Sequence, residues 1–268
     1  GWAVNDWGLS CHALIVTVTY SFHMDVDLIA SRFIEALKFV DDNTTIVTHS
    51  RAGVPYLQGI QSMNERDTVA EVVNYWTTTY PNDFVPSEMC LTEQPYPESK
   101  AKKADILFDS YAVEVDRAGE LTKWAVEAKR FQFVGDNGKN NDFGVAKMFS
   151  PYLKDHSLAH DAKRLAESRV ADRKIVLVYG FEYDLSVTRN ALLKHPAESS
   201  RIREIERVCK NNNPTNPSIN FDLLVERVAP NLQEVVKVMN FADFSMNGLW
   251  RHPCGGRLRV LAWEVAHK

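Results

Sequence analysis

Hydrophobic side chains recur at helical spacing in two stretches of the first third of the chain. The first stretch begins after Asp27, which we expect to cap a helix, and ends near residues 41–43. Its apolar positions are Ile29, Phe33, Ile34, Leu37 and Val40. The second stretch covers residues 66–75, and its apolar stripe consists of Val69, Val72, Val73 and Trp76. Both patterns predict amphipathic helices that pack against a core.

From Lys103 onward the hydrophobic pattern changes from helical spacing to the alternation of a strand. Residues 104–109 and 111–115 have the pattern of extended chain, and residues 116–120 are of turn-forming types. A second strand follows at residues 123–129. This order predicts a β-hairpin centred near Ala118.

The second strand of this hairpin separates apolar side chains from charged ones. One face carries Trp124, Val126 and Ala128. The other face carries Lys123, Glu127 and Lys129. The phase then slips, because Phe131 and Phe133 fall on the charged face. The slip predicts a bulge or the end of the strand beside Lys129.

Helical and strand patterns alternate through the rest of the chain. A polar loop at residues 135–141 precedes helical spacing at 145–153 and at 158–166, where Ser157 is the expected cap. A continuous apolar run at 175–181 is typical of a strand covered on both faces. Further expected elements are a strand at 13–18, a helix at 201–209, amphipathic segments within 221–238 and a strand at 258–263. This order predicts a mixed α/β fold.

Proline, glycine and asparagine mark loops in this chain more clearly than they mark domain boundaries. The length of 268 residues fits one large domain or two smaller ones. We expect residues 1–64 to form an N-terminal extension packed on a core at residues 65–182. Residues 183–268 would add helices and a strand to the same domain.

Composition places the chain among ordinary globular proteins, with 45% hydrophobic and 25% charged residues. The early apolar run at residues 13–18 is far shorter than the roughly 18 residues of a membrane span, and no basic segment precedes it. We therefore expect a cytoplasmic protein that does not contact membranes. Four scattered cysteines without a C-x-x-C pair argue against a disulfide framework and a zinc site. A net charge of −4 means that a nucleic-acid partner would need a local basic face or bound cations.

The predicted hairpin brings carboxylates and an amine within reach of each other. Glu127 and Lys129 lie two residues apart on one strand, and Asp105 and Asp109 share a face of the other. Carboxylate oxygens suit Mg²⁺, which favours one or two carboxylates together with water and phosphate oxygens. A lysine beside such a metal can position or deprotonate an attacking water.

These residues resemble the signature of the PD-(D/E)xK nuclease superfamily, which has the restriction-endonuclease-like fold. The matching segments are Ala104-Asp105-Ile106-Leu107-Phe108 and, inside residues 124–130, Glu127-Ala128-Lys129. Residues 66–181 also follow the order of that fold's core. The resemblance implies a mixed sheet with a core of helix, three-stranded meander, helix and strand, and with N- and C-terminal additions.

Carried onto this chain residue by residue, the resemblance implies a catalytic metal centre on the hairpin. Asp105 and Glu127 would be the metal ligands, and Ala128 would add its backbone carbonyl. Lys129 would orient the attacking water.

Two of the assigned acids, the one on the first core helix and the one on the first hairpin strand, have alternative residues. Many members place a further acid on the first core helix, which would be Glu71 here, although Glu65 competes for the role. A tight hairpin puts Asp109 opposite Glu127, so Asp109 is an alternative ligand, and Asp105 needs a bulge or a wider turn. We prefer Asp105, because a polar approach followed by an apolar strand matches the family better.

Charged residues that follow the proposed site suggest further contacts. Lys139 in the polar loop and Lys147 on the next helix are candidates for contact with a nucleic-acid backbone. The basic residues on the following helices, Arg164 among them, fit a solvated helix face better than such contacts. Asp161 fits a surface charge or a partner of a lysine better than a metal ligand.

The resemblance implies a metal-dependent endonuclease that hydrolyses phosphodiester bonds in DNA, with Mg²⁺ as cofactor and Mn²⁺ able to substitute. The resemblance to the family is also the basis for expecting a role in restriction or defence. The same resemblance is the basis for expecting a homodimer. One alternative is a catalytically inactive protein of the nuclease fold that binds nucleic acid or a protein partner. Another is a protein-interaction domain whose hairpin charges form a plain salt bridge.

Overall fold

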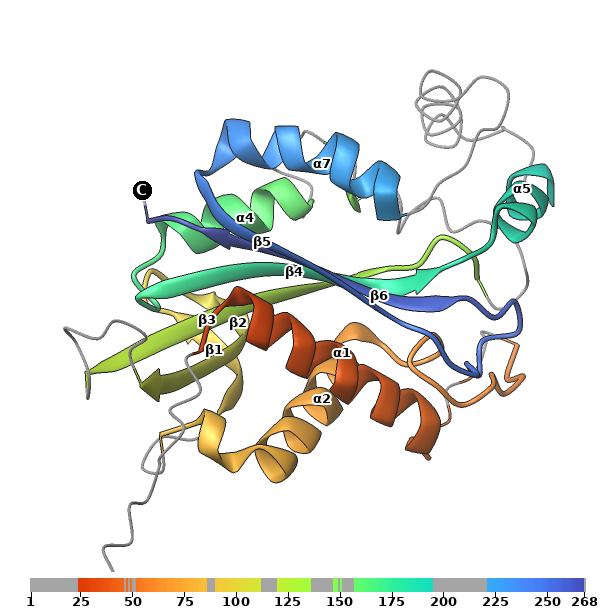
Figure 1. The fold of residues 1–268 in the computed structure, drawn as a ribbon, viewed down its shortest axis with the longest axis horizontal. Helices are drawn as coiled ribbons and strands as arrows, with labels where there is room; N and C mark the ends of the chain where they lie inside the picture. The colour runs from red at the N-terminus through yellow and green to blue at the C-terminus, as the bar shows by residue number, and fades with distance from the viewer. Residues whose placement is uncertain are drawn as a thin grey trace, which may run out of the picture.

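The computed structural model describes residues 24–45, 47, 49, 52–85, 90–111, 120–135, 147–148, 150, 157–194 and 221–267. Within these ranges the chain forms a six-stranded mixed sheet with helices on both faces (Figure 1). The strands are β1 (Leu91–Tyr96), β2 (Ser99–Tyr111), β3 (Leu121–Phe131), β4 (Arg173–Glu182), β5 (Val238–Met246) and β6 (Arg257–Val265). Their order across the sheet is β1-β2-β3-β4-β6-β5. The predicted mixed α/β class is confirmed.

Only the central pair of strands, β3 and β4, is parallel among the strand pairs described. A parallel pair needs a crossover connection, and the chain between β3 and β4 contains helix α4 (Leu158–Glu167). The apolar run predicted as a doubly covered strand is β4, which is buried along almost its whole length. The C-terminal strand β6 then inserts between β4 and β5.

Two pairs of helices cover the two faces of the sheet (Figure 1). One face carries α1 (Val26–Asn43) and α2 (Glu65–Thr79), and the other carries α4 and α7 (Phe221–Val235). A short 3₁₀ helix (Pro81–Asp83) follows α2, and α5 (Leu185–Lys194) follows β4. Ser157 caps α4 as predicted, because its side chain accepts the His160 N–H. The cap of α1 is Asp25 instead of Asp27, which lies inside the first turn, and Asp25 accepts the Leu28 N–H at 2.8 Å.

The sequence pattern did not reveal the two edge strands. In β1 the segment around Pro95 has the composition of a turn, yet a proline is tolerated on an edge strand because its missing N–H faces away from the ladder. The side chains of β5 are largely exposed, so no apolar alternation marks it. Helix α5 was also not predicted.

The sequence predicted a bulge or the end of the strand beside Lys129; β3 has no bulge there and ends two residues later, at Phe131. From Trp124 to Phe131, β3 pairs with β4 without a shift in register. Side chains on both faces of β3 are buried between Trp124 and Ala128, so hydrophobicity and burial do not alternate there. The apparent slip of phase reflects this double coverage.

Several predicted elements lie wholly or mostly outside the described residues. They are the strand at 13–18, the turn at 116–120, the polar loop at 135–141, the helix at 145–153 and the helix at 201–209.

One hydrophobic core joins the N-terminal, central and C-terminal parts of the described chain. Its buried side chains come from α1, α2, both faces of the sheet, α4 and α7, and include Trp76, Trp124 and Trp263. No helix in the described ranges has the length and apolar character needed to cross a bilayer.

Candidate functional site

The predicted site residues meet where β2 and β3 separate. The antiparallel ladder between these strands ends at the pair Ile106 and Val126. Beyond this pair β3 continues along β4, while β2 continues along β1. The same register, continued by one residue, sets Asp105 opposite Glu127. The two carboxylates therefore stand at the start of the opening between the strands.

Two carboxylates accept backbone N–H groups of β3 at this opening. Asp105 Oδ2 accepts the Ala128 N–H at 2.7 Å. Glu65 Oε2, from the first residue of α2, accepts the Arg130 N–H at 2.7 Å. These side chains take the place of the ladder partner that β2 no longer supplies. The Ala128 carbonyl faces the same opening, because the N–H and C=O of a paired strand residue point to one edge.

Two charged side chains of helix α4 form ion pairs with Glu127 and Lys129 on the same part of β3. Lys129 Nζ lies 2.5 Å from Asp161 Oδ2, and Arg164 Nη2 lies 2.9 Å from Glu127 Oε1. Arg164 Nη1 also lies 2.9 Å from Asp161 Oδ1. Asp161 and Arg164 are three residues apart and so project from one side of the helix. Both therefore reach the face of β3 that carries Glu127 and Lys129, as the alternation predicted.

Tyr96, the last residue of β1, closes the site from the edge of the sheet. Its hydroxyl donates a hydrogen bond to Glu127 Oε1, the same oxygen that Arg164 contacts. Burial, followed by the charge of Glu127, raises the pKa of Tyr96. The phenol therefore stays protonated and remains a donor.

Burial and like charge disfavour the ionised carboxylates of this site. Asp105 keeps some accessible surface, yet desolvation raises its pKa well above the usual value, and the charges of Glu127 and Glu65 raise it further. The Ala128 N–H opposes this shift. Burial also raises the pKa of Glu127, despite the opposing charge of Arg164. Asp105 and Glu127 thus form a repelling pair with raised pKa values.

Lys129 is held in the charged form by its neighbours. Burial alone would lower the pKa of its amine, but the charges of Asp161 and Glu65 outweigh burial and raise the pKa above the usual value. The amine is therefore an ammonium ion near neutral pH, and it acts as a hydrogen-bond donor.

The excess of negative charge at this opening fits a divalent cation. Four carboxylates share the site with two side-chain cations, a formal charge of −2: Glu65, Asp105, Glu127 and Asp161 with Lys129 and Arg164. In the part of the chain that is described, no cation forms an ion pair with Asp105, and no three His, Cys, Asp or Glu side chains group as a metal site. Mg²⁺ is usually bound by one or two carboxylates together with water, and Asp105 and Glu127 are the residues here that could hold it.

The alternative in which Asp109 lies opposite Glu127 is wrong. Asp109 pairs with Lys123 across the ladder, and the Lys123 Nζ to Asp109 Oδ2 distance is 3.8 Å. The register centres the hairpin at residue 116 instead of near 118, which brings Asp105 to Glu127 without a bulge. Asp109 therefore lies four residues away from the opening.

The acid that α2 contributes to the opening is Glu65. Glu71 lies six residues further along the helix, about 9 Å along its axis. No hydrogen bond or ion pair within the described ranges joins Glu71 to the residues of the opening. The choice of Glu71 over Glu65 is therefore not supported by the geometry.

The two lysines predicted to contact a nucleic-acid backbone are not placed at the opening by any described contact. Lys139 lies outside the described residues. Lys147 falls in a short helical fragment at residues 147–148.

Three residues of the site were not predicted from the sequence to belong to it. Nothing in the pattern singled out Tyr96, because it stands between two prolines in a segment typical of a turn. Asp161 is the partner of a lysine, as one of its two interpretations held, but it is buried and not a surface charge. Arg164 is not part of a solvated helix face, and its spacing from Asp161 was the available signal.

Comparisons of the chain with protein-family models, with curated proteins and with solved structures found no match. Its chemistry must therefore be argued from the site itself.

Proposed function

We propose that this chain is a metal-dependent phosphodiesterase, an endonuclease acting on DNA, with a restriction-endonuclease-like core. The observation that carries the proposal is the meeting of Asp105, Glu127 and Lys129 at one opening of the sheet. Two carboxylates suit a divalent cation that assists hydrolysis of a phosphodiester, and an ammonium group suits the orientation of the attacking water or a phosphate oxygen.

The order and direction of the elements support the proposed core. Helix α2 precedes the meander of β1, β2 and β3, and α4 then leads to β4, which runs parallel to β3. This is the order of helix, three-stranded meander, helix and strand that the resemblance implies. The remaining elements, α1, α7, β5 and β6, extend the same sheet and its coverage.

In the proposed reaction each side chain has a distinct task. Asp105 and Glu127 would hold Mg²⁺, which offsets charge on the scissile phosphate and lowers the pKa of bound water. Lys129 is charged, so it orients the attacking water or a phosphate oxygen by donating a hydrogen bond, and it does not act as the base. Asp161 positions that amine, and Glu65 adds negative charge beside it.

This function is tested by a survey that measures whether the protein cuts different nucleic acids in the presence of a divalent metal or of chelator. Purified protein is incubated with supercoiled, linear and single-stranded DNA and with RNA, in Mg²⁺, in Mn²⁺ and in chelator. We expect DNA to be cut in either metal and to stay intact in chelator. Failure to cut any DNA, or cutting that persists in chelator, would contradict the proposal.

A binding protein without turnover is the second candidate. It is favoured by the two contacts that Glu127 Oε1 already makes, with Tyr96 and Arg164. This candidate predicts that DNA binds but is cut in neither metal. The survey therefore separates it from the endonuclease, provided that bound DNA is measured alongside cut DNA.

A further inference from the structure

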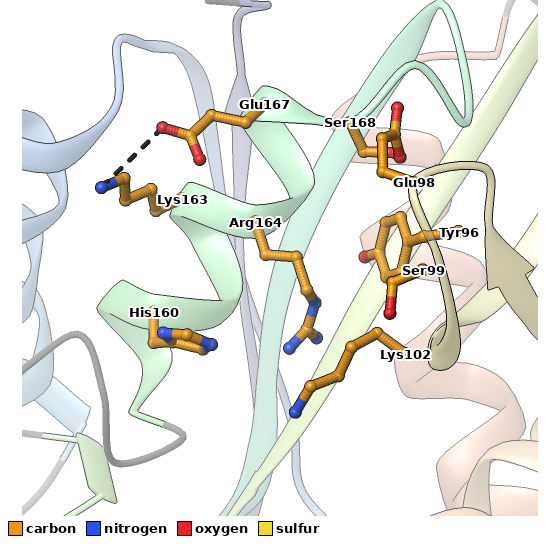
Figure 2. Close-up of a pocket in the computed structure, with 9 residues that line it drawn as sticks. All are labelled: Tyr96, Glu98, Ser99, Lys102, His160, Lys163, Arg164, Glu167 and Ser168. Carbon is orange, nitrogen blue, oxygen red and sulfur yellow. Dashed lines mark hydrogen bonds and ion pairs between the residues drawn. The ribbon is translucent and has the colours of Figure 1, made fainter.

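A pocket of about 600 Å³ adjoins the carboxylate site on the side of the sheet that α4 covers. Its walls are the turn between β1 and β2, the first residues of β2, and α4 (Figure 2). The volume lies within the range of about 300–1,000 Å³ that is typical of sites for small ligands. The pocket is therefore large enough to admit a phosphate group with part of a sugar.

Basic side chains enter this pocket from both walls. Lys102 extends from β2 and Arg164 from α4 toward the same space, whereas Lys163 lines the pocket but points away toward Glu167 (Figure 2). Lys102 is partly buried and forms no ion pair with any described residue. The Nε atom of Arg164 is buried and has no hydrogen-bond partner among the described residues.

The acids of the pocket are already engaged by other groups. The Glu98 carboxylate accepts the Ser168 hydroxyl at 2.8 Å and the Arg169 N–H at 2.9 Å. Glu167 pairs with Lys163 one helical turn away, at 3.9 Å (Figure 2). Neither carboxylate pairs with Lys102. The pocket thus presents Lys102 and Arg164 to an anion.

Two residues join this pocket to the carboxylate site. Arg164 lines the pocket and contacts Glu127 at 2.9 Å, and Tyr96 lines it and donates to the same carboxylate. A group bound in the pocket would therefore lie next to a group bound at the opening between β2 and β3. Two neighbouring sites suit successive phosphates of one nucleic-acid strand, and lysine and arginine are residues that bind phosphate groups.

We infer that this pocket binds a phosphate group of the substrate strand, adjacent to the phosphate that is hydrolysed, and that Lys102 and Arg164 hold it. The group is either the terminal phosphate of a strand or an internal phosphodiester. This inference deepens the proposed function and rests on it for its meaning, but its test does not require turnover.

The test measures binding by the full chain in chelator at one fixed, low ionic strength. The probes are a short single-stranded DNA with a 5′-phosphate and its twin with a 5′-hydroxyl, each followed by fluorescence anisotropy. Lys102→Gln should weaken binding by about tenfold, as expected for the loss of one charge-assisted hydrogen bond. The matched control is Lys103→Gln, because Lys103 is exposed, pairs with Glu93 at 3.5 Å and is not among the residues that line the pocket; it should bind as the wild type does.

The two probes distinguish the two sources of the phosphate. A loss confined to the phosphorylated probe identifies a terminal phosphate, and an equal loss on both identifies an internal one. Equal affinities of Lys102→Gln and Lys103→Gln, or no binding by the wild type, would overturn the inference. Binding that depends on Lys102 in a protein that cuts no DNA in Mg²⁺ would refute the proposed function and leave the pocket standing.

Discussion

At the scale of single residues, the four carboxylates of the site divide into two that accept backbone N–H groups and two that pair with side-chain cations. Asp105 and Glu65 each accept an N–H of β3, and this fixes their orientation at the opening. Glu127 and Asp161 instead pair with Arg164 of α4. Among the described residues, neither Asp105 nor Glu65 forms an ion pair with a cation, and the effects of replacing these acids should differ accordingly.

Replacing Glu65 should slow DNA cutting in Mg²⁺, whereas replacing Glu71 should not. We expect Glu65→Gln to lower the cutting rate in Mg²⁺ by about 10- to 100-fold, the usual loss when a group supporting a metal ligand is removed. Glu71→Gln is the matched control on the same helix, and it should leave the rate unchanged. Initial rates at equal protein concentration check this, and a larger loss in Glu71→Gln would restore the assignment that the sequence favoured.

Removing the charge of Asp105 should stabilise the metal-free protein at high pH. Its folded-state pKa is raised, so its contribution to stability is fully present below the unfolded pKa and is lost as pH rises through the folded pKa. Asp105→Asn cannot ionise and should be more stable than wild type by about 1 kcal/mol near pH 8, with a smaller gain near pH 5. Urea unfolding in chelator measures the difference. A gain that does not grow with pH would contradict the repulsion described here.

At the scale of elements, α4 is held to β3 by buried charges. Asp161 joins Lys129 and Arg164, and its side chain is only 6% exposed. By contrast, Lys163 and Glu167 form an exposed pair on the same helix. The two pairs should therefore differ greatly in their effect on stability.

Truncating the buried acid should cost far more than truncating the exposed base. We expect Asp161→Ala to lower the free energy of unfolding by about 3 kcal/mol, because it leaves buried cations without this partner. Lys163→Ala should cost about 0.5 kcal/mol or less. Denaturant unfolding in chelator checks both variants, and equal losses would show that α4 is not held by this ion pair.

Much of the central core is predictable from the sequence, because its elements have strong local signals. Helix α4 has a serine cap, and β4 is a continuous apolar run. Asp105, Glu127 and Lys129 could be chosen from the alternation within a hairpin and from the family resemblance. Tyr96 and Glu65 could not be assigned to the site from the sequence. Their roles depend on how β2 diverges from β3 and on where α2 begins. Such long-range placement leaves no periodic mark in the sequence.

At the scale of the whole molecule, the chain has a net charge of −4. Its carboxylate site is also negatively charged, so binding of an anionic phosphate there would require bound cations. The carboxylate site carries an excess of negative charge, while the adjoining pocket presents basic side chains. A bound divalent ion would therefore relieve repulsion within the site and favour the approach of a phosphate.

Divalent cations should stabilise the folded protein through this site. A ligand that binds only the folded state adds about 2.7 kcal/mol of stability at a concentration 100 times its Kd. We expect Mg²⁺ and Mn²⁺ to raise the melting temperature of the wild type and to raise that of Asp105→Asn much less. Differential scanning calorimetry with a titration of each metal measures this, and an equal rise in both proteins would place the ion elsewhere.

The most direct test of the central claim is the rate of DNA cutting in Mg²⁺ by wild type, Lys129→Ala and Lys123→Ala. Lys123 is the matched control, because it lies on the same strand, is 44% exposed and pairs only weakly with Asp109 at 3.8 Å. The account predicts that Lys129→Ala cuts at least about 100-fold more slowly, as expected when a group acting in proton transfer or water orientation is removed. Lys123→Ala should cut at the wild-type rate. Equal rates for all three proteins would contradict the assignment of chemistry to this site.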